Sequence, residues 1–262
     1  SKRAAAPRGG AETKRPAGAQ ASSPRRSRPV SLLAVDVGNS ETVVGLFRGK
    51  APVQFWRLTS GRATADEVSL QIEALLRRDG AGTGRGMAAV VCSVAPSLTL
   101  QWLRALEVIT GRPAFEVSAA SVKNLAIRYH DPSAVGADRI ANAIAARGIY
   151  GTPAIVVDLG TATTFDCVSK QGAYLGGVIA PGVMTSAEEL FRRAARIPRV
   201  ELRRPARALG RTTEESLQAG VLWGTAGQVD ALVRRLALEM KGTPNVIATG
   251  GLAKVIAPEC ET

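Results

Sequence analysis

The sequence predicts an α/β protein built from two similar halves, each with a mixed β-sheet flanked by helices. Residues 35–42 and 157–164 share one layout: an apolar residue, Asp, an apolar residue, Gly, and then mostly small or polar residues. The two Asp residues lie 122 positions apart, which is too long for a solenoid repeat and suits two halves of about 100–150 residues. Between these copies the strand-like and helix-like patterns alternate in an order typical of a mixed sheet.

The first copy is a predicted β-hairpin. Residues 32–37 and 42–47 are apolar runs around a Gly-Asn-Ser turn, with the Asp36 carboxylate at its mouth. Backbone N–H groups in such turns bind anions, and a nearby carboxylate can hold a divalent cation through water. The pattern indicates a nucleotide-phosphate site, although hairpins without a ligand use the same residues. A second acidic turn at Asp158 favours the functional interpretation, because two facing turns would hold a phosphate chain and its metal from either side.

The other elements of the first half follow in order. Residues 54–58 are predicted to add a third strand to the sheet, and residues 87–94 and 115–117 two more. A helix is expected after Thr64, an N-cap residue followed by an acidic first turn. Residues 97–110 predict a second helix with an apolar stripe.

A third helix is expected from about Ala137, in an Ala-rich stretch. Asp138 falls in its first turn, where the helix dipole favours an acid, so a structural role alone would explain it. Arg139 is disfavoured at that end of a helix. It therefore predicts an anionic partner, such as a carboxylate held bidentately.

The second half repeats this plan and ends in a glycine loop. Its expected strands are at residues 154–158, 163–168, 172–182 and 245–248. Residues 183–193 and 216–240 predict helices, the second after a capping signal at Thr212–Glu215. Glycines on neighbouring turns of that long helix would permit close packing against another helix or subunit. The loop Thr249–Ala253 opens a further helix at a place suited to an adenosine or phosphate group.

Composition and charge restrict the class of protein. The chain has 262 residues, 45% of them hydrophobic, and a net charge of +12. Residues 1–30 carry eight Lys and Arg against one Glu. We expect them to form a disordered basic extension, either dispensable or able to contact nucleic acid. No apolar run is long enough to predict a membrane span.

Cysteine and histidine usage points to a reducing location and away from zinc chemistry. Three scattered cysteines without a Cys-x-x-Cys pair fit a cytoplasmic protein. The single histidine, His130, speaks against a zinc site or a Ser-His-Asp triad. The sequence also lacks the Gly-x-x-x-x-Gly-Lys pattern of a Walker loop, which excludes that class of phosphate site.

Five motifs occur in an order that resembles type III pantothenate kinases, also called the Bvg accessory factor family. They are Asp36-x-Gly38-Asn39-Ser40, Gly136-Ala137-Asp138-Arg139, Asp158-x-Gly160-Thr161-Ala162-Thr163-Thr164, Gly176-Gly177-x-Ile179-x-Pro181-Gly182 and Thr249-Gly250-Gly251. The resemblance covers about residues 32–253. It implies the fold of the acetate and sugar kinases, Hsp70 and actin: two ribonuclease H-like α/β domains, at residues 31–150 and 151–262, with a cleft between them. Family members commonly continue beyond the last motif, so the second domain is expected to be cut short.

The resemblance implies ATP-dependent phosphorylation of pantothenate, the first step of coenzyme A biosynthesis. It further implies ATP, Mg²⁺ and a monovalent cation (K⁺ or NH₄⁺), and a homodimer with the active site at the interface. From the apolar runs and the charge distribution, we expect no membrane partner and no nucleic-acid partner for the folded part. Asp138 matches the general base, Asp36 the Mg²⁺ ligand and Asp158 the K⁺ ligand. The matching ATP-binding residues are Asp36, Val37, Gly38, Asn39, Ser40, Glu41, Thr42, Val43 and Thr161. The matching pantothenate-binding residues are Tyr129, Gly136, Ala137, Asp138, Arg139 and Thr213. Ser40 stands where the family often has Thr, and both supply a hydroxyl.

Two other functions remain open at this point. One is a non-catalytic nucleotide-binding regulator of transcription on the same scaffold, and the other is a sugar or acetate kinase of the same superfamily. A binding protein would not need a base at Asp138, which favours the enzyme. The carboxylate-seeking Arg139 speaks against a sugar or acetate substrate.

Overall fold

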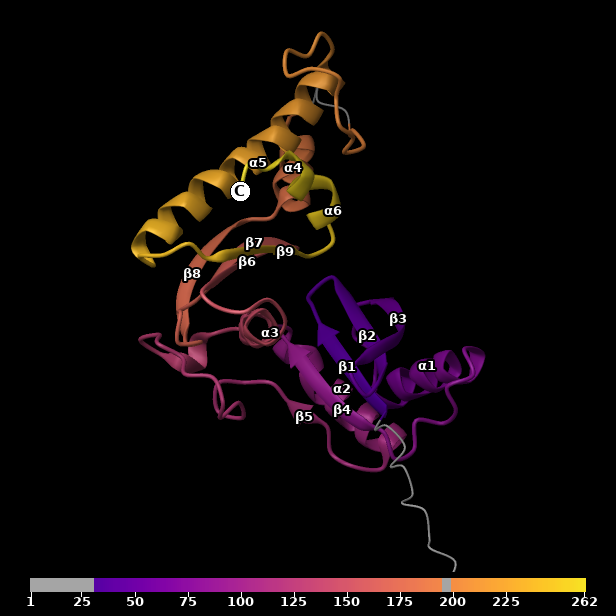
Figure 1. The fold of residues 1–262 in the computed structure, drawn as a ribbon. Helices are drawn as coiled ribbons and strands as arrows, with labels where there is room; N and C mark the ends of the chain where they lie inside the picture. The colour runs from indigo at the N-terminus through magenta and orange to yellow at the C-terminus, as the bar shows by residue number, and fades with distance from the viewer. Residues whose placement is uncertain (1–30, 195–198) are drawn as a thin grey trace, which may run out of the picture.

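The structure, a computed structural model, describes residues 31–194 and 199–262 and contains two mixed β-sheets (Figure 1). The prediction of a disordered extension at residues 1–30 lies outside the described residues. The first sheet has the strand order β3-β2-β1-β4-β5 and the second the order β8-β7-β6-β9.

The first sheet is built on the hairpin that carries Asp36. Strands β1 and β2 pair antiparallel, β3 continues the meander, and β4 and β5 join on the other side of β1 in parallel. The strands are β1 (Ser31–Val37), β2 (Glu41–Arg48), β3 (Ala51–Thr59), β4 (Ala88–Ser93) and β5 (Phe115–Glu116).

The second sheet repeats this plan around Asp158. Strand β6 pairs antiparallel with β7 and parallel with β9, and β8 extends β7. The strands are β6 (Ala154–Leu159), β7 (Ala162–Val168), β8 (Tyr174–Pro181) and β9 (Asn245–Thr249). The predicted duplication of an acidic hairpin with a third strand in a mixed sheet is therefore confirmed.

Helices α1 (Ala65–Arg78) and α2 (Pro96–Thr110) complete the first core. Thr64 caps α1 in a reciprocal capping box with Glu67, as the sequence predicts. The apolar face of α1 is buried: Ile72 packs in one cluster with Trp102 and Leu106 of α2 and with the apolar side chains of the sheet.

Helices cover both faces of the second sheet. Ile140 and Ala143 of α3 (Ala137–Ala145) pack in one core cluster with Val156 and Tyr174. Leu222 of α5 (Thr213–Glu239) packs in another cluster against the opposite face, together with side chains from α4 (Val183–Arg193) and α6 (Ala253–Ile256). Helix α3 also contacts β4 of the first sheet, so it lies between the two sheets (Figure 1). The proposed domain boundary at residue 150 stays a prediction.

The differences from the sequence analysis are local. The long helix α5 begins at Thr213, with Thr212 as its N-cap, so the capping signal is part of the helix start. After α3 the backbone widens into a π-helical turn, η2 (Ala146–Tyr150), and short 3₁₀ turns form at η1 (Pro132–Ala134) and η3 (Ala257–Glu259). In the described part of the chain, no helix has the length and apolar character needed to cross a membrane.

Candidate active site

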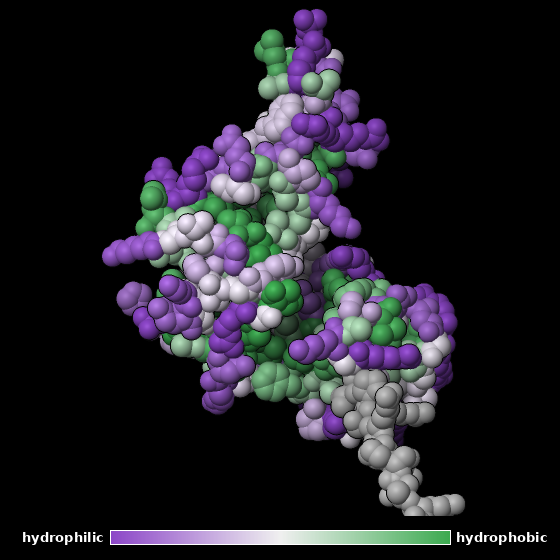
Figure 2. Space-filling view, viewed as in Figure 1, coloured by the Kyte–Doolittle hydropathy of each residue, from purple (hydrophilic) through white to green (hydrophobic). Residues whose placement is uncertain are grey.

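Three carboxylates from three elements converge between the sheets. Asp36 lies near the end of β1, Asp158 near the end of β6, and Asp138 in the first turn of α3. The Asp36 residue keeps exposed surface, but crowding of its carboxylate by the surrounding protein and repulsion from Asp138 and Asp158 raise its pKa to about 6. Because charges influence a pKa only at short range, the effect of Asp138 and Asp158 on Asp36 indicates that the three acids lie near one another. The outline of the molecule narrows between the two sheets in the space-filling view (Figure 2).

The turn after Asp36 is held by the end of β3. The Ser60 hydroxyl donates to the Gly38 carbonyl oxygen at 2.7 Å and lies 2.9 Å from the Thr42 hydroxyl. Gly38, Asn39 and Ser40 stay accessible, whereas the Val37 and Thr42 side chains are buried. Val37 and Thr42 therefore offer almost no surface to a nucleotide in this structure, although the sequence analysis placed them among the ATP-binding residues.

The turn after Asp158 is held by the start of α4 and by the Thr249–Gly251 loop. The Thr185 hydroxyl donates to the Thr161 carbonyl oxygen at 2.8 Å. Gly250 has φ +92°, and a Cβ there would lie 2.5 Å from Asp158 Oδ1 and 2.6 Å from the Leu159 nitrogen. Position 250 therefore requires glycine for both its backbone conformation and its close contact with the acid.

Asp138 is fixed at the start of α3. Its Oδ1 accepts a hydrogen bond from the Arg139 backbone N–H at 2.7 Å, and the side chain is half-buried. A Cβ at Gly136 would lie 2.5 Å from the same oxygen, so the glycine leaves room for the carboxylate. The acid is thus oriented by its own helix start and still reaches solvent.

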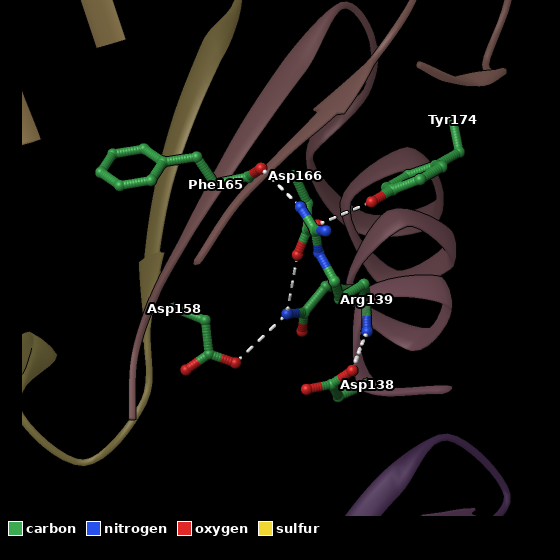
Figure 3. Close-up of polar contacts among 7 residues, drawn as sticks. Asp138, Arg139, Asp158, Phe165, Asp166 and Tyr174 are labelled. Atoms are coloured by element: carbon green, nitrogen blue, oxygen red, sulfur yellow. Dashed lines mark hydrogen bonds and ion pairs between the residues drawn. The ribbon is translucent and has the colours of Figure 1, made fainter. Parts of the chain in front are cut away.

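The predicted anionic partner of Arg139 is inside the protein. Its Nε donates to Asp166 Oδ1 at 2.6 Å and its guanidinium NH2 donates to the Phe165 carbonyl oxygen at 3.1 Å (Figure 3). The guanidinium carbon lies 5.8 Å from the ring centroid of Tyr174. The two bonds go to different acceptors, so this is not the bidentate pair that the sequence suggested. A role for Arg139 in substrate binding stays a prediction.

Asn142 and Asp166 are site residues that the sequence analysis missed. The Asn142 amide nitrogen lies 3.2 Å from Asp158 Oδ2 and 3.4 Å from Asp166 Oδ2, and it donates to both (Figure 3). Burial raises the pKa of Asp158, and this hydrogen bond opposes the rise. Two signals could have pointed to these residues: an acid inside the apolar run of β7, and an amide one helical turn after Asp138.

Cys92 is a further neighbour of the acids. Parallel pairing of β1 and β4 places Cys92 beside Asp36. Burial and the nearby carboxylates of Asp36 and Asp138 raise the pKa of the Cys92 thiol far above its usual range. The thiol therefore stays protonated and is no nucleophile.

The described residues contain acids for metal binding but no ready-made cluster of metal ligands. Within residues 31–194 and 199–262, no three His, Cys, Asp or Glu side chains lie close enough to hold a metal ion. Mg²⁺ commonly binds through one or two carboxylates, water and substrate phosphates, so the carboxylates of Asp36 and Asp158 fit a cation that arrives with a nucleotide.

The predicted substrate-binding residues fall into two groups. Tyr129 is exposed and lines a hollow of about 460 Å³ together with Arg128, His130, Leu175, Gly176 and Gly177. The hollow adjoins Arg139, because a Cβ at Gly177 would lie 3.0 Å from the Arg139 NH2. Thr213 lies elsewhere: it begins α5, which covers the opposite face of the second sheet from α3.

Comparison with known proteins identifies the family. Residues 32–235 match the family model for type III pantothenate kinase. The chain belongs to the type III pantothenate kinase family. A type III pantothenate kinase of Moorella thermoacetica is 44% identical over 229 residues, which cover 87% of this chain and 90% of the relative. One from Geobacter sulfurreducens is 44% identical over 232 residues, covering 88% and 91%.

Solved structures support the fold. The activator of 2-hydroxyisocaproyl-CoA dehydratase from Clostridium difficile, solved with bound ADPNP, is 15% identical with a TM-score of 0.52 and covers 89% of this chain and 87% of its own. Component A of the Acidaminococcus fermentans (R)-2-hydroxyglutaryl-CoA dehydratase is 16% identical with a TM-score of 0.52 over 88% of both chains. The predicted fold class is confirmed, and at these identities the likeness concerns the fold alone.

Membership of the type III pantothenate kinase family decides between the functions left open by the sequence. The relatives described above are named as kinases of pantothenate, so we reject the hypothesis of a sugar or acetate kinase. They give no support to the regulator hypothesis.

Proposed function

We propose that the protein transfers the γ-phosphoryl group of ATP to the primary hydroxyl of pantothenate, giving 4'-phosphopantothenate in the first step of coenzyme A biosynthesis. Family membership gives the reaction, and the convergence of Asp36, Asp138 and Asp158 is the observation in the site that supports it most. Phosphoryl transfer depends on positioning and charge neutralisation more than on covalent chemistry. A site with three acids from separate elements can provide both once cations are bound.

Asp138 is proposed as the general base. Its carboxylate would accept the proton of the attacking hydroxyl as the bond to phosphorus forms. The hydrogen bond from the Arg139 N–H holds one carboxylate oxygen, which leaves the other for the substrate. Asp36 lies close enough to repel it, so the hydroxyl would be activated beside the metal-bound phosphates.

The nucleotide is proposed to lie between the two acidic turns. The accessible backbone of residues 38–40 and the turn at Thr161 would contact its phosphates. Asp36 would hold Mg²⁺ and Asp158 a monovalent cation, with water and phosphate oxygens as the other ligands. When bound, the cations offset the negative charge that builds up on the phosphates.

The hollow beside Tyr129 is proposed to receive pantothenate. It has exposed apolar side chains nearby, with Tyr129 41% and Ile179 65% exposed, and basic groups in Arg128 and His130. These suit a substrate with a branched apolar part and a carboxylate. Arg139 borders the hollow, but Asp166 already neutralises the charge of Arg139. We therefore expect Arg139 to help orient pantothenate and not to be the sole partner of its carboxylate.

A homodimer would bring the remaining predicted residue to the site. Thr213 lies across the second sheet from Asp138 of its own chain, so a second copy would have to supply the Thr213 of the proposed site. A groove of about 370 Å³ between α4 and α5 offers a surface for that copy, and Gly220 and Gly224 line it. A Cβ at either glycine would meet nothing within 4 Å, so this face is unfilled in the single chain.

The activity is tested by ATP consumption with pantothenate, with and without K⁺. We expect turnover that requires pantothenate and rises with K⁺. No turnover with pantothenate under either condition would contradict the proposed function, and turnover that ignores K⁺ would remove the cation role of Asp158.

Subunit mixing tests the shared site. Thr213→Asp adds a negative charge that would repel pantothenate, and an acid is tolerated in the first turn of α5. Asp138→Asn removes the base. Each variant alone should be nearly inactive, and an equal mixture should recover about a quarter of wild-type activity through mixed dimers with one intact site. If the mixture were as inactive as the two single variants, Thr213 would contribute to the active site of its own chain or to none.

A further inference from the structure

A buried acid behind the active site is linked to two of the three reactive carboxylates. Asp166 lies in the middle of β7 with no exposed surface. Its Oδ1 accepts hydrogen bonds from Arg139 Nε at 2.6 Å and from the Tyr174 hydroxyl at 3.2 Å, and its Oδ2 accepts one from the Asn142 amide at 3.4 Å. Because Asp166 is fully buried, these contacts serve the protein itself and not a nucleotide or pantothenate.

The same amide continues to the cleft. Asn142 Nδ2 lies 3.2 Å from Asp158 Oδ2, so one NH₂ group holds the buried acid and the acid at the mouth of β6 (Figure 3). Asp158 and Asp166 come from neighbouring strands and face α3, because β6 and β7 pair antiparallel with Val156 opposite Asp166. The Asn142 amide therefore links helix α3 to strands β6 and β7 of the second sheet.

The position of the base depends on this contact. Asp138 and Asn142 are four residues apart on α3 and thus lie on one face of the helix. Arg139, next to Asp138, is tied to Asp166 by the buried ion pair. Asp166 thereby holds α3 at two points: Arg139 in its first turn and Asn142 about one turn later.

We propose that Asp166 and Asn142 are positioning residues that fix the base Asp138 relative to Asp158. This inference rests on the proposed kinase activity. Asp166 sets the orientation of α3 through Arg139, and Asn142 transmits that orientation to the Asp158 carboxylate. Misplacement by about 1 Å can cost a reaction of this kind about 10²-fold in rate, so the tie between helix and sheet acts on kcat.

Three variants of the network test the proposal. Asn142→Ala removes two hydrogen bonds and Tyr174→Phe removes one, and both keep the ion pair, whereas Asp166→Asn leaves Arg139 without its counter-charge. We expect Asn142→Ala to lower kcat about 10–100-fold, the usual effect of a group behind a ligand, with little change in KM for pantothenate. Tyr174→Phe should have a smaller effect of the same kind. The loss of kcat in Asp166→Asn should equal or exceed that in Asn142→Ala. If Asp166→Asn does not fold, the kcat values of Asn142→Ala and Tyr174→Phe still test the proposal.

Asp230→Asn is the matched control. Asp230 is also a buried acid with several donors, but its partners are the backbone N–H groups of Glu261 and Thr262, on the other side of the second sheet. We expect this variant to lower Tm and keep kcat. Hydrogen exchange of the peptide 136–145 should increase in the network variants and stay unchanged in the control.

A double variant separates a shared network from two separate effects. If Asn142 acts with Asp166, Asn142→Ala combined with Asp166→Asn should lose no more kcat than the worse single variant. Full additivity, or a kcat in Asn142→Ala within twofold of wild type, would overturn the proposal, as would an equal kcat loss in Asp230→Asn. If the wild-type protein shows no turnover with pantothenate, the proposed function fails. The contact between α3 and the second sheet is then tested separately: unchanged hydrogen exchange of peptide 136–145 in the network variants would overturn it.

Discussion

The two acidic hairpins share one topology and differ in how their acids are held. Loss of surrounding water and repulsion from Asp138 and Asp158 disfavour the charged form of Asp36 and raise its pKa. Asp158 is bonded to the Asn142 amide and packed against Gly250, and Asp166 stands behind it. The first acid is held in an unfavourable charge environment, whereas the second is oriented by protein groups.

This difference indicates a division of labour between the halves. An acid left among like charges gains most from a cation, so the first hairpin should respond strongly to Mg²⁺ and nucleotide. An acid already bonded to the protein should depend less on the ligand and more on its supports. The following predictions test that division, from the largest expected effect to the smallest.

Removing the carboxylate of Asp138, which neighbours both Asp36 and Asp158, should have the largest effect on activity. Asp138→Asn should lower kcat about 10²–10⁴-fold, because the proposed general base is lost while binding surfaces remain. It should also lower the pKa of Asp36, because one source of repulsion disappears. Steady-state kinetics measures the first effect. Asp66→Asn, which removes an acid from the first turn of α1, is the control and should keep wild-type kcat; a wild-type kcat in Asp138→Asn would refute the base.

Disturbing the support of the second acid should destabilise the protein. Gly250→Ala places a Cβ 2.5 Å from Asp158 Oδ1 in a backbone conformation that disfavours side chains. We expect a loss of about 1–3 kcal/mol in the free energy of unfolding, measured by denaturant titration. Gly251→Ala is the matched control, because a Cβ there meets nothing within 4 Å. Equal stability of the two variants would show that the second acid needs no such support.

The first acid should make stability depend on pH in an unusual direction. Its pKa is about 6 in the folded protein against 3.8 in an unfolded chain, so the folded state binds this proton more tightly. The contribution of Asp36 to the stability of the ligand-free protein is therefore lost as pH rises from about 4 to about 6. Asp36→Asn should raise Tm at pH 7, with a smaller difference from wild type near pH 4.

Thermal unfolding without nucleotide or Mg²⁺ measures this effect. Asp158→Asn should raise Tm less, because Asn142 already stabilises the ionised form of Asp158. An equal gain for both variants would remove the contrast between the hairpins. In kinetic assays, kcat/KM should fall below pH about 6 if Asp36 is the Mg²⁺ ligand proposed above, because a protonated carboxyl would bind the cation poorly.

The turn supports should give the smallest effects and should match. Ser60→Ala removes the hydrogen bond to the Gly38 carbonyl, and Thr185→Val the bond to the Thr161 carbonyl. Each should cost about 0.5–1.5 kcal/mol of unfolding free energy, the usual net value of one hydrogen bond. If one variant lost several times more unfolding free energy than the other, the two turns would differ in their backbone support as well as in the environment of their acids.

The repeated hairpins could be predicted because their signal is local. Alternating apolar residues and turn glycines defined both copies and suggested that Asp36 and Asp158 face one another. That Asp138 joins them was implied only by the resemblance to type III pantothenate kinases. Asp166 and Asn142 escaped because their role depends on which strand lies under which helix. Arg139 shows the limit: its position predicted an anionic partner, but the identity of that partner, Asp166, follows only from the packing of α3 on β7.

The buried ion pair between α3 and β7 also bears on motion. Helix α3 is tied to β7 by the pair of Arg139 and Asp166, whereas its contact with β4 of the first sheet carries no such bond among the described residues. If the two lobes hinge apart to admit a nucleotide, α3 should travel with the second one. Asp138 and Asp158 would then move as a rigid unit, and the separation that changes during opening and closing would be that from Asp36.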